Sequence, residues 1–160
     1  MSSRRVLVAA ACVVQALLVG VAVAPQILAR TTGEEYRLAV APLDPIDPFR
    51  GAYVVLDYPG LPLQQDGRRS PLEGAVFIPL RDVGGGLTEG GALTRIQPSQ
   101  GPFLRCASDG FGVDCGIESL FASQDEARRI EQELITGAVA VVKVDGRGNA
   151  AVTRVEAAGP

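Results

Sequence analysis

Few side chains of this 160-residue chain could carry catalytic chemistry, and carboxylates are the main candidates. Glycoside hydrolysis needs only two acidic groups, which Asp44, Asp47, Asp57 and Glu118 could supply. The three aspartates could also bind calcium weakly, although they form no EF-hand pattern. Aspartates beside prolines more often form turns. We therefore assign no catalytic, metal-binding or cofactor-binding residue, and a carboxylate-based hydrolase stays an alternative.

The absence of histidine narrows the chemistry further. It removes the usual general base near neutral pH, the usual zinc nitrogen ligand and every Ser-His or Cys-His pair. Residues 50–55 slightly resemble the R-G-D-V-V strand of type I signal peptidases, which use a serine and a lysine. In those enzymes the serine comes soon after the membrane segment and the lysine follows the strand. Here the first serine after the N-terminal region is Ser70, already beyond residues 50–55, and the single lysine, Lys143, lies in the expected terminal hairpin. Enzymatic activity is uncertain, and we favour a non-enzymatic role.

Two cysteines suggest a covalent cross-link. Cys106 and Cys115 flank a segment that contains Asp109-Gly110, a strong turn signal. Strands joined by that turn would bring the two thiols together, and an oxidising compartment would close a disulfide. A free buried pair and a metal site are the alternatives. Two thiolates without histidine or a further partner make a poor zinc site, so we expect the disulfide.

The element that precedes these residues is an uncharged, almost wholly apolar run over residues 6–24. As a helix it is about 28 Å long, close to the thickness of a bilayer. Arg4 and Arg5 precede it, which predicts a cytoplasmic N-terminus and an exterior C-terminal part, at the cell surface or in the periplasm. We predict a basic start over 1–5, a transmembrane anchor over 6–28, a linker over 29–35 and an extracytoplasmic domain over 36–160.

Cleavage as a signal peptide is the alternative to a retained anchor. Ala22-Val23-Ala24 has the A-x-A form of a cleavage site. The run is longer than an ordinary signal peptide core, and Pro25 directly follows the candidate bond. We therefore expect retention, with Gln15 and Gly20 as the contact points for another membrane helix.

The outer part reads as short strands separated by turn signals. Val139, Val141 and Val144 lead through Asp145-Gly146 into a returning strand, which predicts a hairpin. A capping box at Ser123 and a glycine at Gly137 bound one helix. Further strands are expected over 36–41, 52–58, 73–80, 92–97 and 103–107, with Pro79 marking an edge or an end. The predicted fold is α+β, mostly antiparallel β (a small sheet or barrel with one late helix), preceded by one N-terminal transmembrane helix.

Charge argues against two classes of partner. The formal net charge is −3, and no basic patch is visible in the sequence. Neither nucleic acid nor anionic lipid headgroups are therefore expected as partners. The bilayer is the partner that the apolar run predicts.

Residues 50–58 are the most distinctive local pattern, and Val54, Leu56 and Tyr58 would share one face of a strand. The chain here resembles a bacterial family named after the motif GDYXXLXY. Gly51, Tyr53, Leu56 and Tyr58 match the named positions, whereas Ala52 stands where the motif has Asp. The Asp-Pro-rich approach that ends in Phe49-Arg50, the G-I-E-x-x-F segment over 116–121 and the V-x-V-D-G-x-G hairpin are also similar to family members.

This resemblance implies a small, single-pass, extracytoplasmic protein of uncharacterised function that works with a polytopic membrane protein. It carries over no catalytic residue. On the same family-like context, Arg50 and Glu118 are expected to pair near the motif, and Tyr53 or Tyr58 to reach a partner surface.

Overall fold

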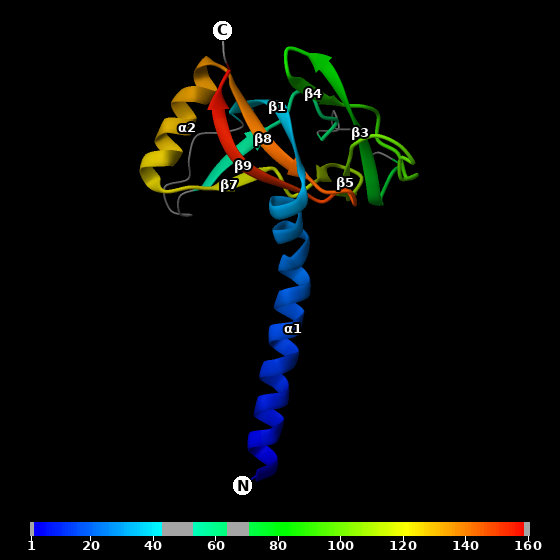
Figure 1. Ribbon diagram of the computed structural model, residues 1–160, viewed down its shortest axis with the longest axis vertical. Helices are drawn as coiled ribbons and strands as arrows, with labels where there is room; N and C mark the ends of the chain where they lie inside the picture. Colours follow the sequence, from blue (N-terminus) through cyan, green and yellow to red (C-terminus); the bar gives the residue numbers. More distant parts are fainter. Residues whose placement is uncertain (1, 43–52, 64–70, 159–160) are drawn as a thin grey trace.

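The computed structural model describes residues 2–42, 53–63 and 71–158, and it combines one long helix with a β-rich domain (Figure 1). Helix α1 (Ser2–Thr32) projects from one side of the domain. The sheets are antiparallel and one short helix comes late in the chain, so the predicted fold class is confirmed. The remaining elements are β1 (Glu34–Pro42), β2 (Tyr53–Asp57), β3 (Gly74–Gly84), β4 (Leu87–Gly90), β5 (Phe103–Ser108), β6 (Val113–Asp114), β7 (Ser119–Phe121), α2 (Gln124–Thr136), β8 (Ala138–Val144) and β9 (Ala150–Ala157).

The first sheet has five strands in the order β7-β2-β1-β8-β9. The predicted hairpin is its β8–β9 pair, in which Val144 lies opposite Ala150. Asp145 shapes the connecting turn, because its Oδ1 accepts hydrogen bonds from the N–H groups of Arg147 and Asn149 at 2.8 and 2.9 Å. Such local acceptance by an aspartate is what makes Asp-Gly segments favourable in turns.

Helix α2 begins and ends where the sequence predicts. The Ser123 hydroxyl accepts from the N–H of Glu126, and Gly137 follows the last turn with a φ of 100°. Ala127, Ile130 and Leu134 form its buried face. This apolar stripe packs the helix against the five-stranded sheet.

The second sheet has four strands in the order β4-β3-β5-β6. Pro79 is expected at an edge or an end. The edge is wrong, since β3 pairs with β5 on one side and with β4 on the other, but Pro79 is the last residue of β3 that pairs with β5. The strand expected over 92–97 is reduced to one bridge between Phe77 and Thr94. The next pair of that ladder would need an N–H from Pro79, which has none. The carbonyl of Pro79 still accepts from Gly91 at 2.7 Å.

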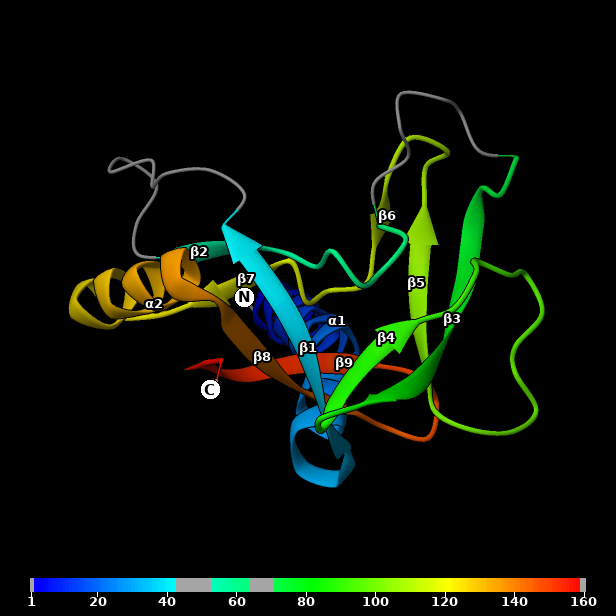
Figure 2. The same ribbon diagram turned by 90° about the horizontal axis from the view of Figure 1, so that it is seen from above.

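The two sheets curl around one shared core and meet where β1 lies beside β4 (Figure 2). Side chains from both sheets and from α2 belong to the same buried cluster. On the outer face of the five-stranded sheet, Arg37, Arg154, Glu35 and Glu156 form an exposed ion-pair network across β8. Exposed pairs of this kind add little stability, so the apolar core is what holds the fold.

Helix α1 joins the domain without an intervening extended segment. It continues to Thr32, and β1 begins at Glu34, so residues 29–35 form the helix end and the first residues of β1. The N–H of Gly33 donates to the carbonyl of Ala29 at 3.0 Å. A Cβ at Gly33 would lie 2.9 Å from the backbone nitrogen of Val144 and against the Ala29 carbonyl. Only a glycine therefore fits between the helix end and β8.

Most of α1 lies outside the domain. Among the described residues, one helix is long and apolar enough to cross a membrane, by length and composition alone, and it covers Arg4–Thr32. Its apolar segment has no residue buried in the domain, whereas Ala29 near its end is fully buried. The apolar part of α1 thus projects, and its last turn is part of the domain.

Candidate functional site

The motif strand β2 turns one face into the core. Val54, Leu56 and the following Tyr58 are buried, with Leu56 2% and Tyr58 1% exposed, while Val55 and Asp57 are partly exposed. This alternation is the two-residue period of a strand with one covered face. β2 lies between β1 and β7, and Val54 pairs with Leu120 of β7. The end of the motif is therefore an interior position of the fold.

The motif holds the segment that precedes β7. The Tyr58 hydroxyl donates to the carbonyl of Ile117 at 2.8 Å, and the N–H of Leu56 donates to the carbonyl of Glu118 at 2.9 Å. Burial, and to a smaller extent the charge of Glu118, raise the pKa of the Tyr58 hydroxyl. The hydroxyl thus stays protonated and remains a donor.

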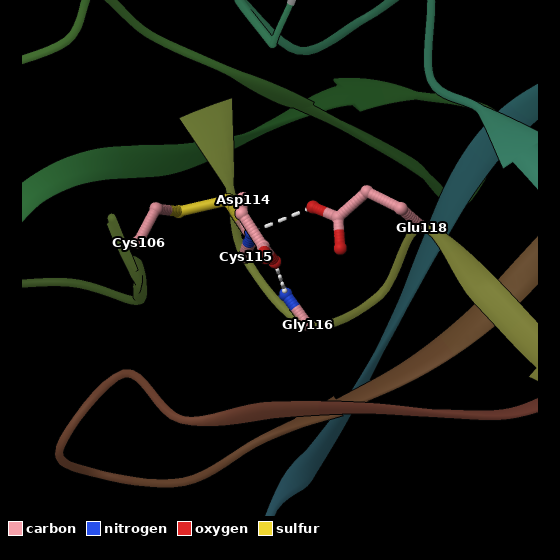
Figure 3. Close-up of a disulfide and its surroundings, with 5 residues drawn as sticks. All are labelled: Cys106, Asp114, Cys115, Gly116 and Glu118. Carbon is pink, nitrogen blue, oxygen red and sulfur yellow. Dashed lines mark hydrogen bonds between the residues drawn. A yellow bond between two sulfur atoms is a disulfide. The ribbon is translucent and has the colours of Figure 1, made fainter. Parts of the chain in front are cut away.

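The segment that Leu56 and Tyr58 contact is a turn over residues 114–118, which two carboxylates and a disulfide stabilise (Figure 3). The Cys106–Cys115 disulfide is present, with the two Cα atoms 4.2 Å apart. Glu118 Oε1 accepts from the N–H of Cys115 at 2.6 Å, and Asp114 Oδ1 accepts from the N–H of Gly116 at 2.8 Å. Gly116 has a φ of 75°, a conformation that favours glycine. Both carboxylates therefore point into the turn and accept its backbone N–H groups.

Glu118 is the acid of this site whose pKa is shifted. Burial raises its pKa, and the backbone N–H groups that donate to it lower it. The nearby Asp114 charge raises the pKa again, so the net direction is upward. A pair of carboxylates with one raised pKa is the arrangement that acid–base hydrolysis uses. Here at least one oxygen of each group accepts a hydrogen bond from the backbone of the turn, which makes a structural role sufficient to explain both.

The described residues contain no group of three or more His, Cys, Asp or Glu side chains that could hold a metal ion. The residues named from the sequence divide into two sets. Leu56, Tyr58 and Glu118 come together at the turn, beside Cys106 and Cys115. Arg50 and Gly51 lie outside the described residues, as do Asp44 and Asp47. Tyr53 begins β2, but its side chain also falls outside the description. The pairing of Arg50 with Glu118 stays a prediction.

Sequence reasoning missed a cleft beside this turn. It has a volume of about 470 Å³ and lies between the end of α1 and β7. A Cβ on Gly116 would lie 3.2 Å from the side-chain nitrogen of Gln26 in α1, so the turn and the helix approach closely. The sequence held a signal for the turn in its G-I-E segment, but none for the approach of α1. The lining residues are Val23, Gln26, Ile27, Arg30, Gly116, Ser119, Leu120, Phe121 and Val152.

The Tyr58–Ile117 hydrogen bond predicts a stability loss in Tyr58→Phe. Removing the hydroxyl leaves the buried carbonyl of Ile117 without this donor, which costs about 1–3 kcal/mol. The matched control is Tyr36→Phe, which removes a hydroxyl bonded to the exposed Glu34 carboxylate and should cost less than about 0.5 kcal/mol. Denaturant unfolding of the full chain in detergent measures both. Equal losses would show that the hydroxyl does not hold the turn.

The raised pKa of Glu118 predicts a pH-dependent difference between the native chain and Glu118→Gln. A folded pKa above the unfolded value adds stability that is complete below the unfolded pKa and disappears as pH rises through the folded pKa. The native chain should therefore gain stability relative to the variant when pH falls from neutral towards the ordinary glutamate range. Unfolding at several pH values measures this difference. Glu89→Gln at the surface is the control, and an equal pH trend in both variants would contradict the assignment.

Comparison with known proteins adds one finding. No curated protein and no solved structure matches the chain. Residues 15–155 match the model of a protein family described as "GDYXXLXY protein". The match begins inside α1 and ends in β9, so it includes the end of the helix, the motif strand, the turn and both sheets. The chain belongs to the GDYXXLXY family.

Proposed function

We propose that this protein is a single-pass membrane protein of the cytoplasmic membrane, and that its extracytoplasmic domain is a non-enzymatic accessory or interaction subunit of a polytopic membrane protein. Its N-terminus lies inside, and its β-rich domain lies outside. The observation that carries the proposal is the contrast along α1. Its apolar side chains from Val6 to Val23 are exposed, whereas Ala29 near its end is fully buried against the domain. A bilayer is the environment that covers such a helix.

The way α1 enters the domain supports retention over cleavage. The helix runs without a break through Ala24 and Pro25, where a cleavage site was the alternative. Cleavage after Ala29 would remove a buried residue and the acceptor of the Gly33 N–H. The helix end contributes to the fold, which argues against cleavage after Ala29.

Two features support the exterior location of the domain. Arg4 and Arg5 precede the apolar run, and basic residues stay on the cytoplasmic side. The Cys106–Cys115 disulfide is suited to an oxidising compartment. The only other cysteine, Cys12, is in α1 and has no disulfide partner.

The hydrogen bonds of the motif support an accessory role for the domain. Tyr58 of the motif bonds to Ile117 of the turn, and Glu118 bonds to Cys115 within the turn. The motif thus stabilises the turn that lies beside the end of α1. Gln15 and Gly20 offer a polar amide and a close-approach position to a neighbouring helix, and a Cβ at Gly20 meets no atom of this chain.

Cysteine labelling tests topology and retention in a Cys12→Ser background. A membrane-impermeant maleimide should label Ser99→Cys, at an exposed loop position, on intact cells. The matched variant Ser3→Cys should react only after permeabilisation, because it precedes the anchor. Labelling of Ser3→Cys on intact cells would reverse the topology. Loss of residues 1–24 from the intact mass would establish cleavage.

Photo-cross-linking in native membranes tests the partner. A photoreactive residue at Gln15 or Gly20 should form adducts with a multi-spanning protein. At 100° per residue, Val14 and Val21 lie about 100–120° around α1 from both positions, so they face a third side of the helix and serve as controls. Adducts of equal yield at all four positions would indicate random collision, and adducts with lipid alone would contradict the accessory role.

A further inference from the structure

The cleft is lined by the end of α1 and by β7. Figure 1 places β7 at the end of the domain from which α1 projects. Figure 2 also places β7 beside α1 when the domain is seen from above. We call this region the membrane-proximal surface. It consists of the cleft-lining residues Val23, Gln26, Ile27 and Arg30 of α1 with Leu120 and Phe121 of β7.

The membrane-proximal surface lies at a defined depth along the anchor. Val23 is the next-to-last residue of the uncharged run over 6–24, which is about as long as a bilayer's hydrocarbon core is thick. Ile27 follows one helical turn later. Residues that line the same cleft as Val23 and Ile27 therefore lie near the boundary between hydrocarbon and headgroups, if residues 6–24 span the membrane.

Phe121 is the most exposed of the large apolar side chains that the structure describes in the domain. It is 86% exposed, although it lies in a strand that pairs with the buried motif strand. Exposed aromatic and aliphatic side chains at this depth are typical of segments that insert into the interface. In water the same exposure would be unfavourable.

The polar part of the cleft fits the phosphate of a lipid. Arg30 lies one turn beyond Gln26, on the side away from the hydrocarbon, where a basic side chain can reach the headgroups. Of the described residues that line the cleft, none carries a carboxylate. Apolar walls towards the hydrocarbon and a cation above them match the order of groups in a phospholipid.

We propose that the membrane-proximal surface is a lipid-binding surface, in which Phe121 inserts between phospholipids and the cleft holds a phospholipid with its phosphate near Arg30. This inference rests on the proposed membrane anchoring. The contact would fix the domain against the bilayer and limit its tilt about the end of α1.

Tryptophan fluorescence tests this contact, because the chain contains no tryptophan. Phe121→Trp in the full chain gives a single emitter at the proposed contact. The chain is reconstituted into phosphatidylcholine vesicles that contain phosphatidylcholine brominated near the top of its acyl chains. We expect the brominated lipid to lower the emission at least about twofold, as for an interfacial aromatic side chain.

The matched control is Ile135→Trp. Ile135 is 79% exposed in the last turn of α2, and that end of α2 lies on the opposite side of the domain from α1 (Figure 1). Its emission should be unchanged by brominated lipid and strongly quenched by aqueous acrylamide. A nitroxide at Phe121→Cys or Ile135→Cys, in the Cys12→Ser background, gives a second comparison through accessibility to oxygen and to a water-soluble nickel complex.

Flotation of the vesicles separates the two hypotheses. A chain that does not float with lipid overturns the anchoring and the lipid contact together. A chain that floats while Phe121→Trp behaves like Ile135→Trp leaves the anchor intact and overturns the lipid contact. If the Phe121→Trp side chain is protected from aqueous acrylamide in native membranes but not in pure lipid vesicles, this surface contacts a protein partner. That result would also overturn the proposal.

Discussion

The buried hydrogen bond from Tyr58 to the Ile117 carbonyl is the constraint on which the arrangement of the two sheets depends. Residues 115–118 are the chain's crossing from β6 in the four-stranded sheet to β7 in the five-stranded sheet. Tyr58 follows the motif strand and holds this crossing from the core side, while the Leu56 N–H holds the next carbonyl. A crossing with buried carbonyls is stable only when each finds a donor. The motif supplies two of them.

The crossing is fixed from its other side as well. The disulfide ties Cys115 to β5, and the Glu118 carboxylate accepts the Cys115 N–H. These constraints favour the same conformation of the turn, and their stabilising effects need not add because they share partners. The raised pKa of Glu118 follows from this arrangement, since the carboxylate is partly buried where it accepts the Cys115 N–H. The raised pKa of Glu118 is thus explained by the fold, and no substrate is needed to account for it.

Short sequence patterns predicted the helix ends and turns, but they could not predict contacts between residues far apart in the chain. The Ser123 cap, the Gly137 end and the Asp145 turn were visible, because each depends on residues a few positions apart. The strand expected over 92–97 is reduced to one bridge at Thr94, because the neighbouring strand carries Pro79, which has no N–H to continue the pairing. Tyr58 and Ile117 are 59 residues apart, so the sequence could name both segments but not their contact. The cleft beside α1 requires the tertiary fold and had no local pattern.

The motif and helix α1 are linked through the same turn. Tyr58 holds Ile117, Gly116 beside it approaches Gln26 of α1, and β7 begins directly after Glu118. The position of β7 against the helix therefore depends on the end of the motif strand. Leu56 and Tyr58 make the two contacts that hold the crossing, and both are present although Ala52 replaces the motif aspartate. In this chain, Leu56 and Tyr58 thus link the domain to its helix through the turn.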